Sequence, residues 1–211
     1  MQRNNDQTQI KVLFNDNFIL AVYKPRGIDF HTEKNNLIKL VKEQVQPSVY
    51  PVHRLDKDVD GIVLFAKNNH IANLIVQQFK SRQIEKIYLA IIDSPLTKTV
   101  LIKRPIMLDK TILKAETFVW PVEVRKDLTL VKVAITTGRF HQIKIHLKEA
   151  NLKLLKDSFG SFLSSVFISL IHPRTKRRIL ITFLRGSETY KTWLALTDSK
   201  IKLTVKSLLK W

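Results

Sequence analysis

The sequence predicts an α+β fold in which helices flank a mixed, largely antiparallel central sheet. Strand-like segments follow one another in neighbouring pairs, and helical segments are inserted between those pairs rather than alternating regularly with single strands. The 211 residues contain no internal repeat, no low-complexity linker and no break in composition. We therefore expect one folded domain over residues 10–198, followed by a basic tail, residues 199–211, whose weak periodicity predicts no element.

The N-terminal part predicts a hairpin followed by a helix. Residues 10–14 and 18–23 are short apolar runs separated by three Asn and Asp residues, which is a pattern typical of a β-hairpin. Apolar side chains then recur at helical spacing over residues 36–46, and either Asn35 or Asn36 could cap that helix.

The middle of the chain opens on a charged loop and a buried strand. Residues 62–66 are an uninterrupted apolar run, and Gly61 precedes them at a point where a turn would need a free φ angle. Helical spacing follows over residues 71–79. Residues 85–92 alternate as a strand does, which places Tyr88 on one face with Lys86 and Ala90, opposite the face of Ile87, Leu89 and Ile91.

The C-terminal half predicts a second hairpin, a third helix and two final strands. Residues 114–124 and 128–135 are rich in β-formers and are joined by a short charged turn. Residues 140–150 have helical spacing. Residues 179–184 and 191–196 are read as the last strands.

The charge balance predicts a polyanionic partner. Lys and Arg total 36 against 18 Asp and Glu, which gives a formal net charge of +18. The cations are scattered among apolar residues, so we expect a folded basic surface that binds nucleic acid with strongly salt-dependent affinity. No apolar run is long enough to span a bilayer, the first nine residues are polar, and there is no cysteine. We expect a cytoplasmic protein without disulfides that does not enter a membrane.

The residues available for chemistry are carboxylates, cations and aromatics. His141 and His146 lie five apart, which is not a helical metal-ligand spacing, and the chain has neither a glycine-rich phosphate loop nor a G-x-S-x-G turn. A carboxylate nucleophile, a cation beside it and an aromatic ring that stacks on a base together suit chemistry on a nucleobase. We therefore expect neither a metal nor a cofactor.

Three segments carry a resemblance to a known family. They are His53-Arg54-Leu55-Asp56 with the apolar strand after it, Lys86-Ile87-Tyr88-Leu89-Ala90, and Gly138-Arg139-Phe140-His141-Gln142-Ile143-Lys144. In this order they resemble the H-R-L-D, K-x-Y-x-A and G-R-x-H-Q-I-R motifs of the RluA-type RNA pseudouridine synthases. Lys24-Pro25-Arg26-Gly27 is similar to an earlier K-P-x-G element of that family. The resemblance spans residues 10–195 and implies a catalytic domain of the pseudouridine synthase fold.

The resemblance implies a role for seven side chains. Asp56 corresponds to the nucleophilic aspartate, Tyr88 to the tyrosine that stacks on the uracil, and Lys144 to a cation that pairs with the aspartate. The implied substrate-binding residues are those that hold the flipped-out nucleotide or position the loops around it: Arg54, Arg139, His53 and His141. We expect the two other carboxylates of the first motif, Asp58 and Asp60, to be solvated.

The chain also departs from the family pattern. Val59 and Asp60 stand where the family has Thr and Ser, Lys144 stands in place of an arginine, and the later segments around residues 156–165 match weakly. Our expectation is a short, monomeric RNA pseudouridine synthase, an isomerase acting on tRNA or large-subunit rRNA. The alternative is a catalytically weakened paralogue that serves as an RNA-binding or ribosome-assembly protein. A DNA-binding protein is a remote third reading, since no helix gathers base-reading side chains.

Overall fold

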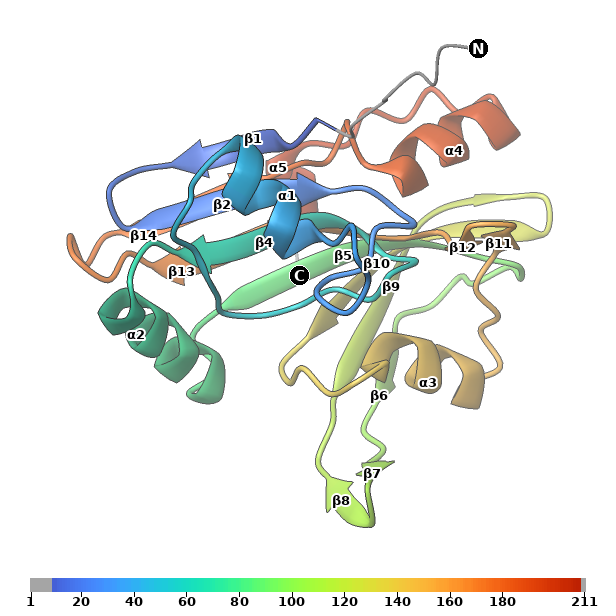
Figure 1. Cartoon of the computed structure of the whole chain (residues 1–211). Helices are drawn as coiled ribbons and strands as arrows, with labels where there is room; N and C mark the ends of the chain where they lie inside the picture. Colours follow the sequence, from blue (N-terminus) through green and yellow to red (C-terminus); the bar gives the residue numbers. More distant parts are fainter. Residues whose placement is uncertain (1–8, 210–211) are drawn as a thin grey trace.

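The structure, a computed structural model, describes residues 9–209 around one large sheet (Figure 1). Its strands are β1 (Lys11–Asn15), β2 (Ile19–Lys24), β3 (Tyr50–Pro51), β4 (Asp60–Ala66), β5 (Glu85–Ile92), β6 (Val100–Ile102), β9 (Thr117–Arg125), β10 (Leu128–Ile135), β13 (Leu163–Ile171) and β14 (Arg178–Thr182). The main path runs β1-β2-β4-β13-β5-β10-β9-β6, with β3 paired to β4 and β14 to β13. Only β4 and β13 pair in parallel among the described strands, so the predicted fold class is confirmed.

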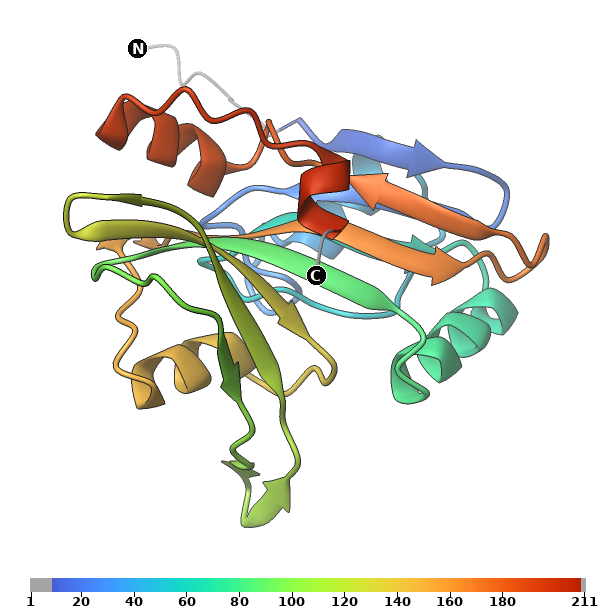
Figure 2. The ribbon, with the colours of Figure 1, turned by 180° about the vertical axis from the view of Figure 1, so that it is seen from behind.

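Helices cover both faces of the sheet (Figures 1 and 2). Apolar residues of α1 (Leu37–Gln44) and α3 (Gln142–Glu149) pack on one face. Those of α2 (Asn69–Lys80), α4 (Glu188–Thr197) and α5 (Val205–Leu209) pack on the other. Because both faces are covered, the central strands are apolar on both sides, and every residue of β4 is buried.

The predicted early elements form as expected. The strands at 10–14, 18–23 and 85–92 correspond to β1, β2 and β5, and the helix predicted from residue 36 is α1. The Asn36 side chain caps α1 by accepting a hydrogen bond from the Lys39 amide at 3.0 Å. The hairpin predicted in the second half is the β9–β10 pair, and the helix after it begins at Gln142.

Gly61 is needed for a different reason from the one predicted. It lies inside β4, with φ at +128°, and not in a turn before the strand. A Cβ at this position would lie 2.2 Å from the Ser165 carbonyl oxygen of β13. Glycine is therefore required by the close approach of β13 to β4, and by a backbone angle that other residues rarely adopt.

The final strand predicted at residues 191–196 is wrong, since this segment is α4. The Ser187 hydroxyl caps the helix by accepting from the Tyr190 amide, and Tyr190 and Trp193 bury one side of it while Lys191 is exposed. A short run of alternating residues resembled a strand because the helical period was read over too few positions. The central strand β13 was missed, since its buried serines interrupt the apolar pattern.

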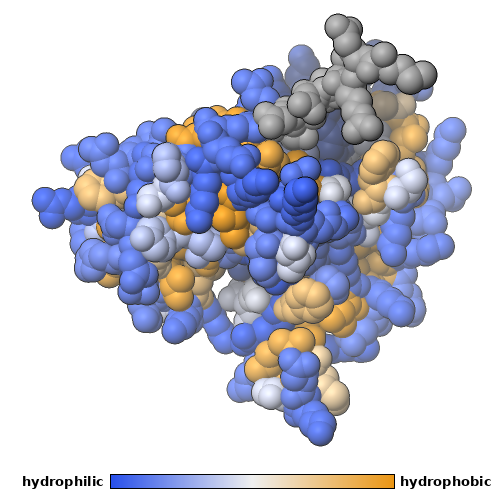
Figure 3. Space-filling view, in the orientation of Figure 1, coloured by the Kyte–Doolittle hydropathy of each residue, from blue (hydrophilic) through white to orange (hydrophobic). Residues whose placement is uncertain are grey.

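Two further segments complete the described chain. A small hairpin, β7 (Ile106–Leu108) and β8 (Thr111–Leu113), projects from the end of the sheet. It exposes Met107 and Ile112 at 72% and 68%, and Figure 3 shows hydrophobic surface on this projection. Leu203 and Leu208 of the C-terminal segment are buried against the sheet. The polar residues 1–8 and residues 210–211 of the predicted tail lie outside the described part. No helix within residues 9–209 is long and apolar enough to cross a membrane.

Candidate active site

A cleft of about 470 Å³ brings together all seven side chains that the sequence predicts for the site. Its lining includes Arg54 and Asp56 from the loop between β3 and β4, Tyr88 from β5, and residues of the loop and helix after β10, which are Arg139, His141 and Lys144. His53 lies at its edge. Within the lining, Asp56 is the sole carboxylate among six Lys and Arg side chains.

Asp56 is held between two basic side chains. Its Oδ2 atom lies 3.0 Å from Lys144 Nζ and 3.3 Å from His141 Nε2, and the Asp56 side chain is 18% exposed. The loop that carries it is anchored by Leu55 and Val59, which are both buried in the core. An accessible carboxylate on an anchored loop, oriented by the Lys144 ammonium and the His141 ring, has an arrangement suited to a nucleophile.

Asp58 takes part in this site, so the prediction that it is solvated is wrong. Lys144 Nζ donates to Asp58 Oδ1 at 2.5 Å, and the Ser161 amide donates to Asp58 Oδ2 at 3.4 Å. Burial acts to raise the pKa of Asp58, but the Lys144 ammonium and the amide hold it below its usual value. Lys144 therefore contacts the carboxylates of Asp56 and Asp58 at the same time.

A short hairpin packs against Asp58 and holds it in place. This hairpin pairs β11 (Lys156–Asp157) with β12 (Gly160–Ser161), and Arg26 binds it through both Asp157 oxygens and the Gly160 carbonyl. A Cβ on Gly160 would lie 2.4 Å from Asp58 Cβ. The weakly matching segment of the sequence thus directly supports the loop that carries Asp56 and Asp58.

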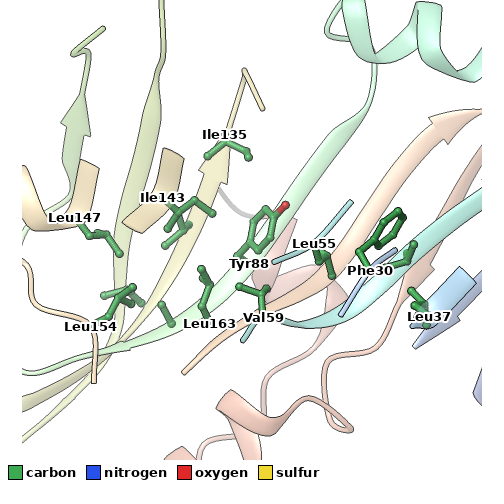
Figure 4. Close-up of a cluster of buried hydrophobic side chains, with 14 of the residues drawn as sticks. Phe30, Leu37, Leu55, Val59, Tyr88, Ile135, Ile143, Leu147, Leu154 and Leu163 are labelled. Carbon is green, nitrogen blue, oxygen red and sulfur yellow. The ribbon is translucent and has the colours of Figure 1, made fainter. Parts of the chain in front are cut away.

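Tyr88 lies on the floor of the cleft. Its ring packs among apolar side chains, and its hydroxyl points away from Val59 and Leu163 (Figure 4). Burial, and secondarily the charge of Asp56, raise the pKa of the Tyr88 hydroxyl far above its ordinary value. The phenol therefore stays neutral at physiological pH and presents an uncharged ring next to Asp56.

The loop before α3 is fixed by Gln142. The Gln142 side-chain oxygen accepts from the Thr137 hydroxyl at 2.7 Å and from the Arg139 amide at 3.0 Å. The helix begins directly after His141, which has a left-handed φ of +53°. The loop thereby holds Arg139 and His141 at the cleft.

Phe140 forms a stack at the mouth of the cleft that the sequence did not predict. Its ring is 48% exposed, lies 3.7 Å from the His141 ring and stands 5.8 Å below the Arg54 guanidinium. The sequence did contain a clue to this role of Phe140, because an aromatic residue inside a basic motif is typical of a nucleic-acid-binding surface.

His53 has a structural place, as expected. Its Nε2 accepts from the Leu64 amide of β4 at 2.9 Å. Burial, together with the charge of Lys86, lowers the pKa of His53 to about 3, so the ring is neutral. His53 thus ties the Asp56 loop to the strand behind it. Across residues 9–209, no three acidic or histidine side chains gather where a metal ion could bind.

Asp60 is completely buried, so the prediction that it is solvated is also wrong. Its carboxylate accepts from the Ser164 hydroxyl at 2.5 Å, the Glu188 amide at 3.1 Å and the Tyr23 hydroxyl at 3.3 Å. Burial raises the pKa of Asp60 above its usual value even against these donors. The carboxylate joins β4 to β13 and to the start of α4.

Asp60→Ala should lower the free energy of unfolding at pH 7 by about 3 kcal/mol, because three donors lose their buried acceptor. Asp60→Asn keeps an acceptor for the Glu188 and Tyr23 donors and should cost less than about 1.5 kcal/mol. The pKa of Asp60 is higher in the folded state than its unfolded value of 3.8. The free energy of unfolding of the wild-type protein should therefore fall as pH rises above 3.8, whereas Asp60→Asn lacks this contribution. Urea unfolding measures the difference in free energy of unfolding between the two proteins, and this difference should shift in favour of Asp60→Asn between pH 4 and pH 7. A difference that is constant with pH would contradict this.

The chain matches the family described as RNA pseudouridylate synthase over residues 18–149. It is 30% identical to tRNA pseudouridine synthase C of Haemophilus influenzae, over 82% of this chain and 92% of that protein. It is 27% identical to ribosomal large subunit pseudouridine synthase C of Buchnera aphidicola, over 81% of this chain and 65% of that protein. The solved structure of human RNA pseudouridylate synthase domain containing 1 shares the fold, with a TM-score of 0.75 and 16% identity over 95% of this chain and 93% of that chain. The chain therefore belongs to the RNA pseudouridylate synthase family and is an isomerase of that family.

Proposed function

We propose that this enzyme converts uridine to pseudouridine in tRNA or large-subunit rRNA, with Asp56 as the nucleophile. The observation that carries the proposal is the position of Asp56, which is in contact with Lys144 and shares a cleft with Tyr88. A carboxylate, a cation and a neutral aromatic ring are the groups this isomerisation requires.

The proposed reaction needs no cofactor, because its atoms and electrons balance within the nucleotide. Asp56 attacks the base or the sugar, and the bond between N1 of the uracil and C1′ of the ribose breaks. The uracil turns over, C5 bonds to C1′, C5 loses its proton, N1 gains one, and the carboxylate is released. Tyr88 holds the loose uracil by stacking, and Lys144 balances the charge of the carboxylate as it is consumed and restored.

Base flipping places a further demand on the site. A uridine must leave its stack to reach Asp56, at a cost of a few kcal/mol that contacts in the cleft must offset. Arg54, Arg139 and His141 line the entrance and are our candidates for holding the displaced nucleotide. The net charge of +18 supplies the non-specific attraction to RNA.

tRNA is the first substrate to test. The chain covers nearly the whole of the Haemophilus influenzae tRNA enzyme but about two thirds of the Buchnera aphidicola ribosomal enzyme. The experiment incubates the protein with tRNA transcripts and with large-subunit rRNA fragments, and maps pseudouridine in each. We expect stoichiometric product at one or a few uridines. Tight binding to every RNA with product in none would show instead an RNA-binding protein without turnover.

A further inference from the structure

Lys86 is a cation in the cleft that the proposed reaction does not use. It lies on β5 two residues before Tyr88, so both side chains point to the same face of the sheet. Within residues 9–209 its ammonium forms no hydrogen bond and no salt bridge, and its closest charge-stabilising neighbour is the Phe79 ring at 5.5 Å. Burial lowers the pKa of Lys86 to about 8. The Lys86 side chain is only partly exposed, and an ammonium that is partly desolvated without an anion is stabilised when a ligand supplies one.

The surroundings of Lys86 are basic and open. Lys80 at the end of α2 and Arg82 just after it line the same cleft, and His53, whose pKa is lowered in part by the charge of Lys86, is neutral. Asp56, the sole carboxylate of the lining, is engaged by Lys144 and His141. The space in front of the ammonium is kept free by Gly138, where an added Cβ would lie 3.2 Å from Lys86 Nζ.

We propose that Lys86, with Lys80 and Arg82 at the entrance, binds the backbone phosphate next to the target uridine. This inference rests on the proposed function, because it takes the uracil to be stacked on Tyr88. Two residues along a strand span about 7 Å, which is about the reach of one nucleotide, so a base at Tyr88 brings a flanking phosphate to Lys86. Lysine is a compact point charge suited to a phosphate oxygen.

The test measures RNA binding directly, with a stem-loop substrate in which single linkages next to the target are made neutral methylphosphonates. Wild-type protein should lose about tenfold in affinity when one particular linkage is neutral. Lys86→Met should lose about tenfold on the natural RNA and show no further loss at that linkage, since the two changes remove the same contact. Its kcat should stay within about threefold of wild type while KM rises about tenfold.

Two controls separate binding from folding. Lys86→Met removes an unpaired, partly buried charge, so its melting temperature should be equal to or above that of wild type, whereas a purely structural role would lower it. Lys191→Met removes a 57% exposed lysine from α4 on the opposite face of the sheet, and should keep the full sensitivity to the neutral linkage.

The pH dependence gives an independent readout. Besides Asp56 and its partners Lys144 and His141, the titratable and charged groups that line the cleft with Lys86 are His53, Tyr88, Lys80, Arg82, Arg54 and Arg139. Among these, the pKa of His53 is lowered and that of Tyr88 is raised to values well outside pH 7 to 9. Wild-type affinity should fall by up to about tenfold between pH 7 and 9, as the ammonium deprotonates in the free protein. Lys86→Arg, which keeps its charge, should bind with little change over that range.

Three outcomes would overturn the phosphate site. The first is an affinity of Lys86→Met for natural RNA that equals that of wild type. The second is that the affinity losses from Lys86→Met and from a neutral linkage multiply at every linkage. The third is that Lys86→Met loses affinity while wild type is insensitive to every neutral linkage, which would mean that Lys86 contacts a base. Because binding is measured without turnover, failure of the proposed function is distinguishable. Wild-type protein that makes no pseudouridine but shows the linkage effect would refute the reaction and keep the site.

Discussion

Asp56→Asn should reduce pseudouridine formation by at least about 1,000-fold and leave RNA affinity within about threefold of wild type. An amide has the shape of the carboxylate but is a very weak nucleophile, so the covalent step is lost. We expect the contacts with RNA to come from the cations of the cleft and surface, which the substitution retains. Single-turnover assays with excess enzyme measure the chemical step, and filter binding at fixed salt measures the affinity.

The matched control is Asp127→Asn, in the turn between β9 and β10 and away from the cleft. It makes the same chemical change and should leave both rate and affinity unaltered. If Asp56→Asn retained more than a few per cent of the rate, the nucleophile would be misassigned. If it lost binding and rate together, Asp56 would have a structural role.

The elements that could be predicted from sequence are those whose pattern is local. β5 was predicted with its observed bounds because its β-rich run ends at clear boundaries. α1 was predicted because Asn36 precedes a regular amphipathic spacing. These features depend on residues a few positions apart, which a single sequence displays.

The elements that could not be predicted depend on contacts between distant residues. β13 lies at the centre of the sheet, but its serines interrupt the apolar run, and no strand was predicted there. Ser164 can be buried there because its hydroxyl bonds to Asp60, which is 104 residues away in the chain. Asp60 departs from the family motif and Ser164 lies in the weakly matching later segment, and the two side chains bind each other. Neither residue could therefore be interpreted alone.

The residues of the site could be predicted from the sequence, but the contacts between them could not. The motifs gave the seven side chains of the cleft. They did not give Asp58 its place beside Lys144, because that contact joins the first motif to the third and is supported by the hairpin at Asp157. Phe140 and Lys86 were passed over, since a stack and an unpaired cation are apparent only once the neighbours are placed.

Lys144→Met should lower kcat by about 100-fold with a small change in KM. Lys144 Nζ is 3.0 Å from Asp56, so its loss removes the charge that balances the nucleophile during the reaction. Lys148→Met, one turn further along α3 and exposed, is the matched control and should retain full activity. Steady-state kinetics on the mapped substrate measure both variants. A change in KM alone would mean that Lys144 only binds RNA.

The second carboxylate explains how a lysine serves at this position. An arginine can fix a carboxylate through two parallel hydrogen bonds, whereas a lysine offers a point charge with free rotation. Here Asp58 removes that freedom, because Lys144 Nζ donates to it at 2.5 Å while contacting Asp56. Asp58→Asn should therefore lower kcat by about tenfold, and Asp58→Glu should recover part of the loss.

The coupling between the two residues is the decisive measurement. If Asp58 acts only by positioning Lys144, the double variant Asp58→Asn with Lys144→Met should be no slower than Lys144→Met alone. Lys144→Arg should not exceed wild-type activity by more than about threefold, because the ammonium is already fixed between two carboxylates. Effects that multiply in the double variant, or a large gain with arginine, would mean instead that Lys144 is a loosely held cation and that Asp58 acts independently of it.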